Sequence, residues 1–405
     1  MRVQRAPEEG IPELTADAAA LADARGELLA VSGPLAVDTE RAQSFRYTGK
    51  AYLIQLRRGD GETILIDPIP FEGDQERADF STLAADLADV EWIIHAASND
   101  LPCLAEVKFT PKILFDTELA GRLLGYEKVN LAQLMADHLG VSIIKNHGAE
   151  NWSVRPLPPS WRSYAALDVE HLAELRDVLA QKLKDASKWE FAQEEFAYLV
   201  AHAYDPLPVY DEPWRRTSGM HQVHGRRALA IIREVWLDRD QLAQASDTAP
   251  GRLLADKTLT AYADTLASRR KVDARFLRSL PDFRRPATLA HLKVWVEAIN
   301  RALKLPESEL PTRSKAKSPL PSQWAWKRTE PERYERYQRI RDVLAAEAVA
   351  RELPLRNLLA PDALRQLIAD VDAQPNTADI ARLLTQLEVR PWQQNIVSPL
   401  IATNW

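Results

Sequence analysis

The sequence predicts an α/β domain of about 180 residues followed by a region built of helices alone. Two observations support this fold class. Short apolar runs of strand length gather between residues 35 and 116, with helical spacing between them, and no strand pattern recurs after Trp189. Because the strands cluster early in the chain, we expect a mixed sheet rather than an all-parallel one.

The elements of the α/β domain are predicted from the spacing of apolar residues and from the glycines between them. Strands are expected at residues 35–40, 52–58, 63–68, 91–98 and 112–116. Helices are expected at residues 80–90, 101–109, 117–126, 130–140 and 163–185. The last of these is a long amphipathic helix, whose apolar side carries Leu167, His171, Leu175 and Leu179. The polar, Ala-rich residues 1–30 are expected to form an N-terminal arm or a leading helix.

The helical region divides into two units. Helical periodicity marks residues 226–245, 251–268, 287–303, 333–350, 361–371 and 377–388. Residues 305–331 are rich in Pro, Ser and charged side chains, which is typical of an extended connector. We therefore expect the α/β domain at 31–212, one helical domain at 213–304 and a second at 332–405.

The composition is that of a soluble globular protein, since 46% of the 405 residues are hydrophobic and 27% are charged. No apolar run approaches the length of a membrane span, and the N-terminus lacks the apolar core of a signal peptide. We therefore expect a cytoplasmic monomer without a membrane partner. The single Cys103 excludes an internal disulfide and a Cys-based zinc cluster. The chain has no Gly-rich phosphate loop, which argues against a nucleotide cofactor.

Charge is distributed unevenly along the chain, although the net value is only −6. Residues 1–213 contain 20 Lys and Arg against 36 Asp and Glu, a net charge of −16. Residues 214–330 contain 23 against 12, a net charge of +11, and the remainder is nearly neutral. An acidic part joined to a basic part is expected where one performs metal chemistry and the other holds a polyanion. The alternative is that the basic helices are ordinary solvated surfaces.

Four acidic residues and one tyrosine occupy positions that suit a chemical role. Asp38 and Glu40 share one face of a predicted strand, so their charges repel unless a cation lies between them. Asp100 follows a buried strand, and Asp168 lies one helical turn after Tyr164 on the same helix face. Each residue also has a structural interpretation: a charge pair on an edge strand for the first two, a helix N-cap for Asp100 and a core position for Tyr164.

Taken together, these residues resemble the three motifs of the DEDD exonucleases, in the subgroup with a Tyr in the third motif. The motifs read VDTE (37–40), HAASNDLPCL (95–104) and YAALD (164–168), in the family's order and spacing. The segments 51–68 and 151–175 resemble the ribonuclease D family in particular. Residues 214–263 resemble an HRDC domain, the helical nucleic-acid-binding module of that family, and 318–405 resemble a more divergent second copy.

The resemblance implies a ribonuclease H-like fold, with a mixed sheet of about five strands flanked by helices, followed by helical HRDC-type domains. It also implies a 3′–5′ exoribonuclease that releases nucleoside 5′-monophosphates from RNA, such as tRNA precursors, with two Mg²⁺ or Mn²⁺ ions. Asp38 would bind both ions, Glu40 and Asp168 would complete the site of the water-activating ion, and Asp100 would hold the second. Tyr164 would orient the attacking water. A DNA exonuclease on the same fold and a non-catalytic RNA-binding scaffold are the alternatives.

Four further residues are candidates for substrate binding. His95 ends a buried strand, while Lys145, Trp152 and Arg155 precede the third motif and could line a groove for the RNA backbone. The alternatives are a core histidine and a solvated loop.

Overall fold

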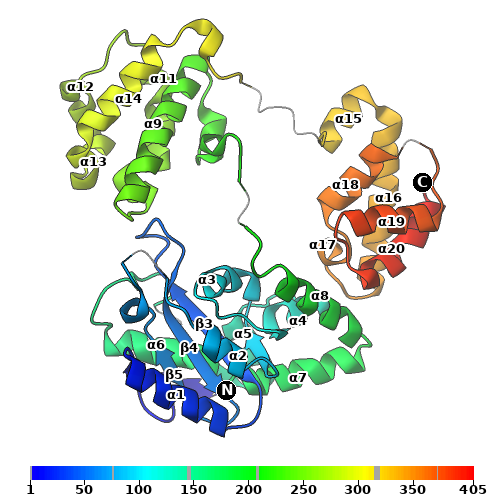
Figure 1. The fold of residues 1–405 in the computed structure, drawn as a ribbon. Helices are drawn as coiled ribbons and strands as arrows, with labels where there is room; N and C mark the ends of the chain where they lie inside the picture. The colour runs from blue at the N-terminus through cyan, green and yellow to red at the C-terminus, as the bar shows by residue number, and fades with distance from the viewer. Residues whose placement is uncertain (1, 75–76, 144–146, 207–208, 314–319, 372) are drawn as a thin grey trace.

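The computed structural model describes residues 2–74, 77–143, 147–206, 209–313, 320–371 and 373–405 (Figure 1). They form an α/β domain, a first helical unit (residues 213–313) and a second helical unit (residues 320–405). In the part of the chain that is described, no helix is both long enough and apolar enough to span a membrane.

The α/β domain is built on a six-stranded sheet in the order β2-β5-β4-β3-β6-β7. Its strands are β2 (Leu14–Thr15), β3 (Leu35–Arg41), β4 (Ala51–Arg58), β5 (Ile64–Ile66), β6 (Glu91–Ile94) and β7 (Ile113–Asp116). β4 runs antiparallel to both of its neighbours, whereas β3, β6 and β7 are parallel to one another. The predicted mixed sheet is therefore confirmed. The additional strand β2 is two residues long, too short to give a periodic signal.

The central strand β3 is apolar because both faces of the sheet are covered. Leu35 and Val37 are fully buried. In the register of β3 with β4, Asp38 lies opposite Gln55 and Glu40 lies opposite Leu53. The pairing shifts by one residue directly after Glu40, where the strand ends in a bulge.

Eight helices surround the sheets of this domain: α1 (Ala18–Ala30), α2 (Ser81–Asp86), α3 (Leu101–Glu106), α4 (Thr117–Leu123), α5 (Leu131–Leu139), α6 (Pro159–Glu170), α7 (Leu172–Asp185) and α8 (Trp189–Ala201). The N-terminal residues thus contribute α1, and β1 (Arg2–Gln4) pairs with β8 (Val141–Ile143) in a separate two-stranded sheet.

The prediction of one continuous helix over residues 163–185 is wrong, because the helix breaks at His171 between α6 and α7. The His171 backbone is not helical, and Nε2 of its buried ring donates a 2.7 Å hydrogen bond to Gln4 Oε1. A partner more than 160 residues away in the chain therefore fixes the position of the break.

The two helical units share an arrangement of three consecutive helices. The first contains α9 (Arg226–Ala245), α10 (Pro250–Leu253), α11 (Asp256–Ala267), α12 (Ala274–Ser279), α13 (Pro286–Ala290) and α14 (Leu292–Lys304). The second contains α15 (Gln323–Thr329), α16 (Pro331–Ala350), α17 (Leu355–Leu358), α18 (Pro361–Asp370), α19 (Thr377–Gln386) and α20 (Pro391–Thr403). In each unit a 20-residue helix is followed by a one-turn helix and a third helix at the same spacing.

Helix α15 lies inside the stretch that was predicted to be an extended connector. Its Trp326 is fully buried and packs edge-on against Tyr337 of α16. The second helical unit therefore begins before residue 332. Short 3₁₀ turns complete the structure: η1 (Ile69–Phe71), η2 (Ala97–Asn99), η3 (Pro213–Arg216), η4 (Met220–Gln222), η5 (Pro281–Arg284) and η6 (Glu307–Glu309).

The two helical units contact the α/β domain differently. The second shares a continuous apolar core with it, and Trp392 of α20 stacks on Phe191 of α8 with ring centroids 4.5 Å apart. The first has its own core, which Tyr47 from the loop after β3 joins at the edge. The loop after β3 thus packs a side chain of the α/β domain against the core of the first helical unit.

Candidate active site

Three carboxylates meet at the end of β3. Asp38 and Glu40 project from the same face of this strand because side chains alternate with period two. Helix α6 packs across β3 and β4 and brings Asp168 to that face. Each of the three residues offers an oxygen that lies within 4.8 Å of those of the other two, and Glu40 and Asp168 are buried. The structure thus joins residues 128 positions apart, in the arrangement expected from the motifs.

Asp100 is held beside this group through Thr39, which lies between the two β3 acids. The Thr39 hydroxyl donates a hydrogen bond to the Asp100 carboxylate. Asp100 is buried at the start of α3, and this burial raises its pKa to about 6. The negative charges of Asp116 and Asp168 add to the rise, whereas the Thr39 hydroxyl and the Arg41 charge oppose it. A cation at the site would favour the ionised form of Asp100.

Asp116 fixes the backbone that precedes Asp100, a role that the sequence analysis missed. Its carboxylate accepts hydrogen bonds from the backbone N–H groups of Ala96 and Ala97, at 3.1 and 2.8 Å. It also caps α4 by accepting from two further N–H groups. Ala96 has a φ of 61°, a left-handed conformation that costs free energy unless its surroundings hold it. An Asp that directly ends a strand and begins a helix was the available signal for such a cap.

Tyr164 lies one turn before Asp168 and is mostly buried, with 9% of its surface exposed. Burial and the three neighbouring carboxylates raise the pKa of its hydroxyl far above the ordinary value, and the hydroxyl is hydrogen-bonded to Asp168. It is therefore a proton donor or a water-orienting group at neutral pH and not a base. Gly148 approaches the hydroxyl so closely that an added Cβ would lie 3.1 Å from it.

A cavity of about 220 Å³ opens beside the carboxylates. Two loops form its walls, one after β3 and one before α6. Its lining residues are Thr39, Glu40, Arg41, Gln43, Ser44, Gly148, Ala149 and Glu150.

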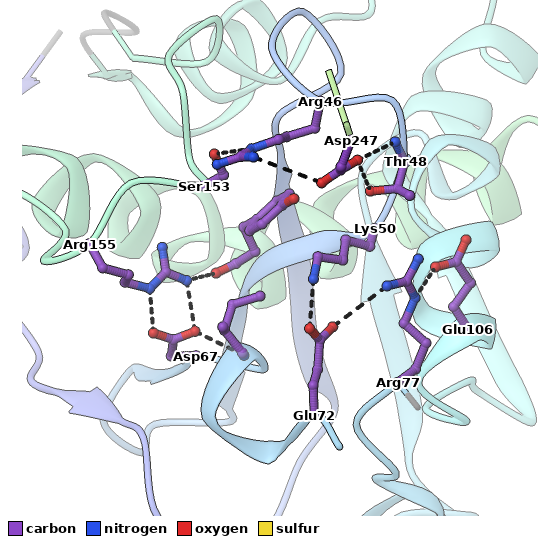
Figure 2. Close-up of polar contacts among 12 residues, drawn as sticks. Arg46, Thr48, Lys50, Asp67, Glu72, Arg77, Glu106, Ser153, Arg155 and Asp247 are labelled. Atoms are coloured by element: carbon purple, nitrogen blue, oxygen red, sulfur yellow. Dashed lines mark hydrogen bonds and ion pairs between the residues drawn. The ribbon is translucent and has the colours of Figure 1, made fainter. Parts of the chain in front are cut away.

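Two predicted substrate-binding residues have structural roles. Trp152 is fully buried beside Tyr164, with ring centroids 6.3 Å apart, so it presents no surface to a substrate. Arg155 uses all five of its N–H donors. Two bind Asp67, at 2.6 and 2.7 Å (Figure 2), and three bind backbone carbonyls. Trp152 therefore has no exposed surface with which to contact RNA, and its predicted contact is contradicted. An RNA contact by Arg155, whose side chain is 27% exposed, stays a prediction.

The other two candidates have different outcomes. His95 is half-buried at the end of β6, and its Nδ1 lies 2.9 Å from the Thr117 hydroxyl, so a substrate contact through this residue stays a prediction. Lys145 lies outside the described residues.

The donor set fits a hard divalent cation. All the converging side chains are carboxylates, and oxygen ligands favour Mg²⁺ or Mn²⁺ over softer metals. Three like charges within 4.8 Å of one another repel, and a cation among them would turn this repulsion into attraction. The residues present are therefore suitable to bind such an ion.

Comparisons with known proteins show which family the chain resembles. A family model described as 3′–5′ exonuclease matches residues 12–184, and one described as 3′ to 5′ exonuclease C-terminal domain matches residues 319–404. The ribonuclease D of Pseudomonas paraeruginosa is 30% identical over 285 residues, which cover 68% of this chain and 71% of that protein. The ribonuclease D of Gluconacetobacter diazotrophicus is 29% identical, with coverage of 71% and 72%.

Solved structures extend the likeness over the whole chain. A protein from Bifidobacterium adolescentis superposes with a TM-score of 0.86 at 33% identity. The superposition covers 100% of this chain and 99% of that protein's chain. Escherichia coli RNase D superposes with a TM-score of 0.62 at 22% identity, with coverage of 92% and 98%, a likeness of fold. With the carboxylates and Tyr164 in position, the chain belongs to the ribonuclease D family of 3′–5′ exoribonucleases.

Proposed function

We propose that the protein hydrolyses RNA from the 3′ end by a two-metal-ion mechanism and matures tRNA precursors or other structured RNAs. The observation that carries this proposal is the convergence of Asp38, Glu40 and Asp168 within 4.8 Å, beside a protonated Tyr164. Two bound divalent cations would supply an activated water and would stabilise the charge that develops on the leaving oxygen.

Each residue of the site would have a separate role in the reaction. Asp38 would hold both ions, Glu40 and Asp168 would complete one ion site, and Asp100 would hold the other. The hydroxyl of Tyr164 would orient the attacking water by hydrogen bonding, and its raised pKa keeps it protonated for that purpose. Thr39 and Asp116 would keep Asp100 in place through their hydrogen bonds.

The first helical unit would bind the RNA backbone, in keeping with its resemblance to an HRDC domain. Many of its arginines are engaged within the protein; Arg239, for example, is buried against Asp256. The same unit carries a basic cluster of exposed residues: Arg269, Arg270, Lys271, Arg275, Arg278, Arg284 and Arg285. Within it, Arg284 donates to two backbone carbonyls and Arg269 lies over the Phe276 ring. None of the seven forms an ion pair with another residue of the described ranges, so their charges are available to phosphates.

The test is incubation of the purified protein with 3′-extended tRNA, with Mg²⁺ or with EDTA, followed by product analysis. We expect nucleoside 5′-monophosphates released from the 3′ end in Mg²⁺ only. Matched single-stranded RNA and DNA distinguish an exoribonuclease from a DNA exonuclease on the same fold. If the protein bound RNA but released no nucleotide under either condition, it would be a scaffold and the proposal would be wrong.

A further inference from the structure

The first helical unit contacts the rim of the active site through a turn and through residues of the helices on either side of it, α9 and α10. This turn follows α9, and its residue Asp247 has a left-handed φ of 42°. One carboxylate oxygen of Asp247 accepts hydrogen bonds from the backbone N–H and the hydroxyl of Thr48, each at 3.1 Å (Figure 2). It also accepts from the backbone N–H of Tyr47 at 3.1 Å. The carboxylate therefore caps the loop of residues 42–50, which we call the 42–50 loop.

Further contacts hold the same loop to this turn and to the adjoining helices. The Tyr47 hydroxyl donates to the Asp240 carboxylate of α9 at 3.3 Å. The Ala249 N–H donates to the Phe45 carbonyl at 3.0 Å, and Arg252 Nε donates to the Ser44 carbonyl at 2.8 Å. The Arg252 guanidinium also lies over the Phe45 ring, 3.7 Å from its centroid. The 42–50 loop begins directly after β3, two residues beyond Glu40, and forms one wall of the cavity with Gln43 and Ser44.

The connection continues from this loop to the opposite wall, formed by residues 147–153. Arg46 Nε donates to the Ser153 hydroxyl at 2.7 Å, and the Ser153 hydroxyl donates to Asn151 Oδ1 at 2.6 Å. Another nitrogen of Arg46 lies 4.0 Å from the Asp247 carboxylate (Figure 2). The 147–153 loop carries Gly148, where an added Cβ would lie 3.1 Å from the Tyr164 hydroxyl.

The second helical unit provides an internal comparison. The equivalent turn follows α16, and its residue Glu352 also has a left-handed φ, of 52°. Its carbonyl accepts a hydrogen bond from the buried Lys188 side chain and fits closely against Gly125, which follows α4. In both units this turn contacts the α/β domain. Among the described residues, the turn at Asp247 contacts the 42–50 loop beside the cavity, whereas the turn at Glu352 contacts residues away from it.

We propose that Asp247 is a positioning residue for the exonuclease reaction. It fixes the 42–50 loop directly and the 147–153 loop through Arg46, so that both walls hold the substrate's 3′ end in line with the carboxylates and Tyr164. The first helical unit then contributes to the rate of hydrolysis as well as to RNA binding. This inference rests on the function proposed above.

The experiment uses the full chain and a single-stranded RNA trinucleotide, because removal of the whole unit would remove RNA binding and loop positioning together. We expect Asp247→Ala to lower kcat about tenfold, since misplacement of reacting groups reduces rate more than affinity. Asp247→Asn should recover most of the rate, because its amide oxygen can accept the same backbone hydrogen bonds. Arg46→Ala should lower kcat too, and its effect should not add to that of Asp247→Ala, because both act through one connection.

Asp264→Ala is the matched control. Asp264 is an exposed acid of the same unit. It too accepts from two backbone N–H groups, those of His224 and Gly225, but these lie inside the unit. It should leave kcat unchanged. The inference is overturned if Asp247→Ala cleaves the trinucleotide at the wild-type rate, if it changes KM alone, or if Asp264→Ala loses as much. A wild-type protein without Mg²⁺-dependent cleavage would instead overturn the proposed function.

Discussion

Replacement of Asp38 by Asn is expected to abolish turnover and, in the absence of metal, to stabilise the fold. The oxygens of Asp38, Glu40 and Asp168 lie within 4.8 Å of one another, so loss of the Asp38 charge removes two repulsive pairs. At this separation one pair of unit charges interacts by about 1 kcal/mol in bulk water and about 3.5 kcal/mol at an effective dielectric constant of about 20.

The expected gain is smaller than the sum of the two pairs, because the metal-free wild type can relieve some repulsion by binding a proton. We expect the free energy of unfolding to rise by about 1–3 kcal/mol in EDTA. A rise of this size corresponds to an increase in Tm of at least about 2 °C for a domain of this size. Saturating Mg²⁺ should reduce or reverse the difference, because the ion binds and stabilises the wild type more strongly than the variant.

The assay is thermal unfolding of wild type and Asp38→Asn in EDTA and in Mg²⁺, together with the rate of nucleotide release. Asp60→Asn removes an exposed carboxylate between β4 and β5 and serves as the control for the loss of one charge. A metal-free Asp38→Asn protein that melts at or below the wild-type temperature would refute the repulsion argument. Near-normal turnover by the variant would refute the assignment of Asp38 as a metal ligand.

Three other predictions address the remaining parts of the site. Tyr164→Phe should lower kcat about a hundredfold with little change in RNA affinity, because only water orientation is lost. Single-turnover kinetics and equilibrium binding measure the two quantities. Equal losses of rate and affinity would make Tyr164 a substrate contact. Replacement of Arg270, Lys271, Arg275 and Arg278 by Ser should weaken tRNA binding and flatten the plot of log affinity against log KCl by about 0.7–0.9 for each phosphate that the protein no longer neutralises; an unchanged slope would separate the basic cluster from RNA. Arg155→Ala should lower the free energy of unfolding by about 3 kcal/mol in denaturant titrations, because it leaves the buried Asp67 carboxylate without its cation. Arg155→Lys should recover part of this loss. A loss of RNA affinity without a loss of stability would show that Arg155 contacts the substrate.

The sequence predicted those parts of the site that depend on short-range geometry. Asp38 and Glu40 share a face because a strand alternates with period two, and Tyr164 and Asp168 share a face because a helix repeats every 3.6 residues. These relations hold in any strand or helix, so they could be predicted before the structure was known. The mixed sheet could be predicted for the same reason, from the early clustering of apolar runs.

The sequence could not predict which distant group would form hydrogen bonds with a given polar side chain. Arg155 resembles a phosphate-binding residue in a loop, but Asp67, which precedes it by 88 positions, takes two of its hydrogen bonds. The predicted long helix breaks at His171 because Gln4 binds its ring. Helix α15 forms in a Pro-rich stretch because Trp326 finds a buried site against Tyr337.

The sequence alone therefore determined the fold class, the three motifs and the identity of the carboxylates that we propose as metal ligands, because each is encoded by local periodicity and residue type. Only the tertiary structure decided that Thr39 and Asp116 hold Asp100 in place and that Asp247, two hundred positions beyond Tyr47 and Thr48, caps the loop beside the site. Hydrogen bonds between distant segments leave no periodic trace in a sequence. They form where packing brings a donor and an acceptor together, so they become visible only when the chain is folded.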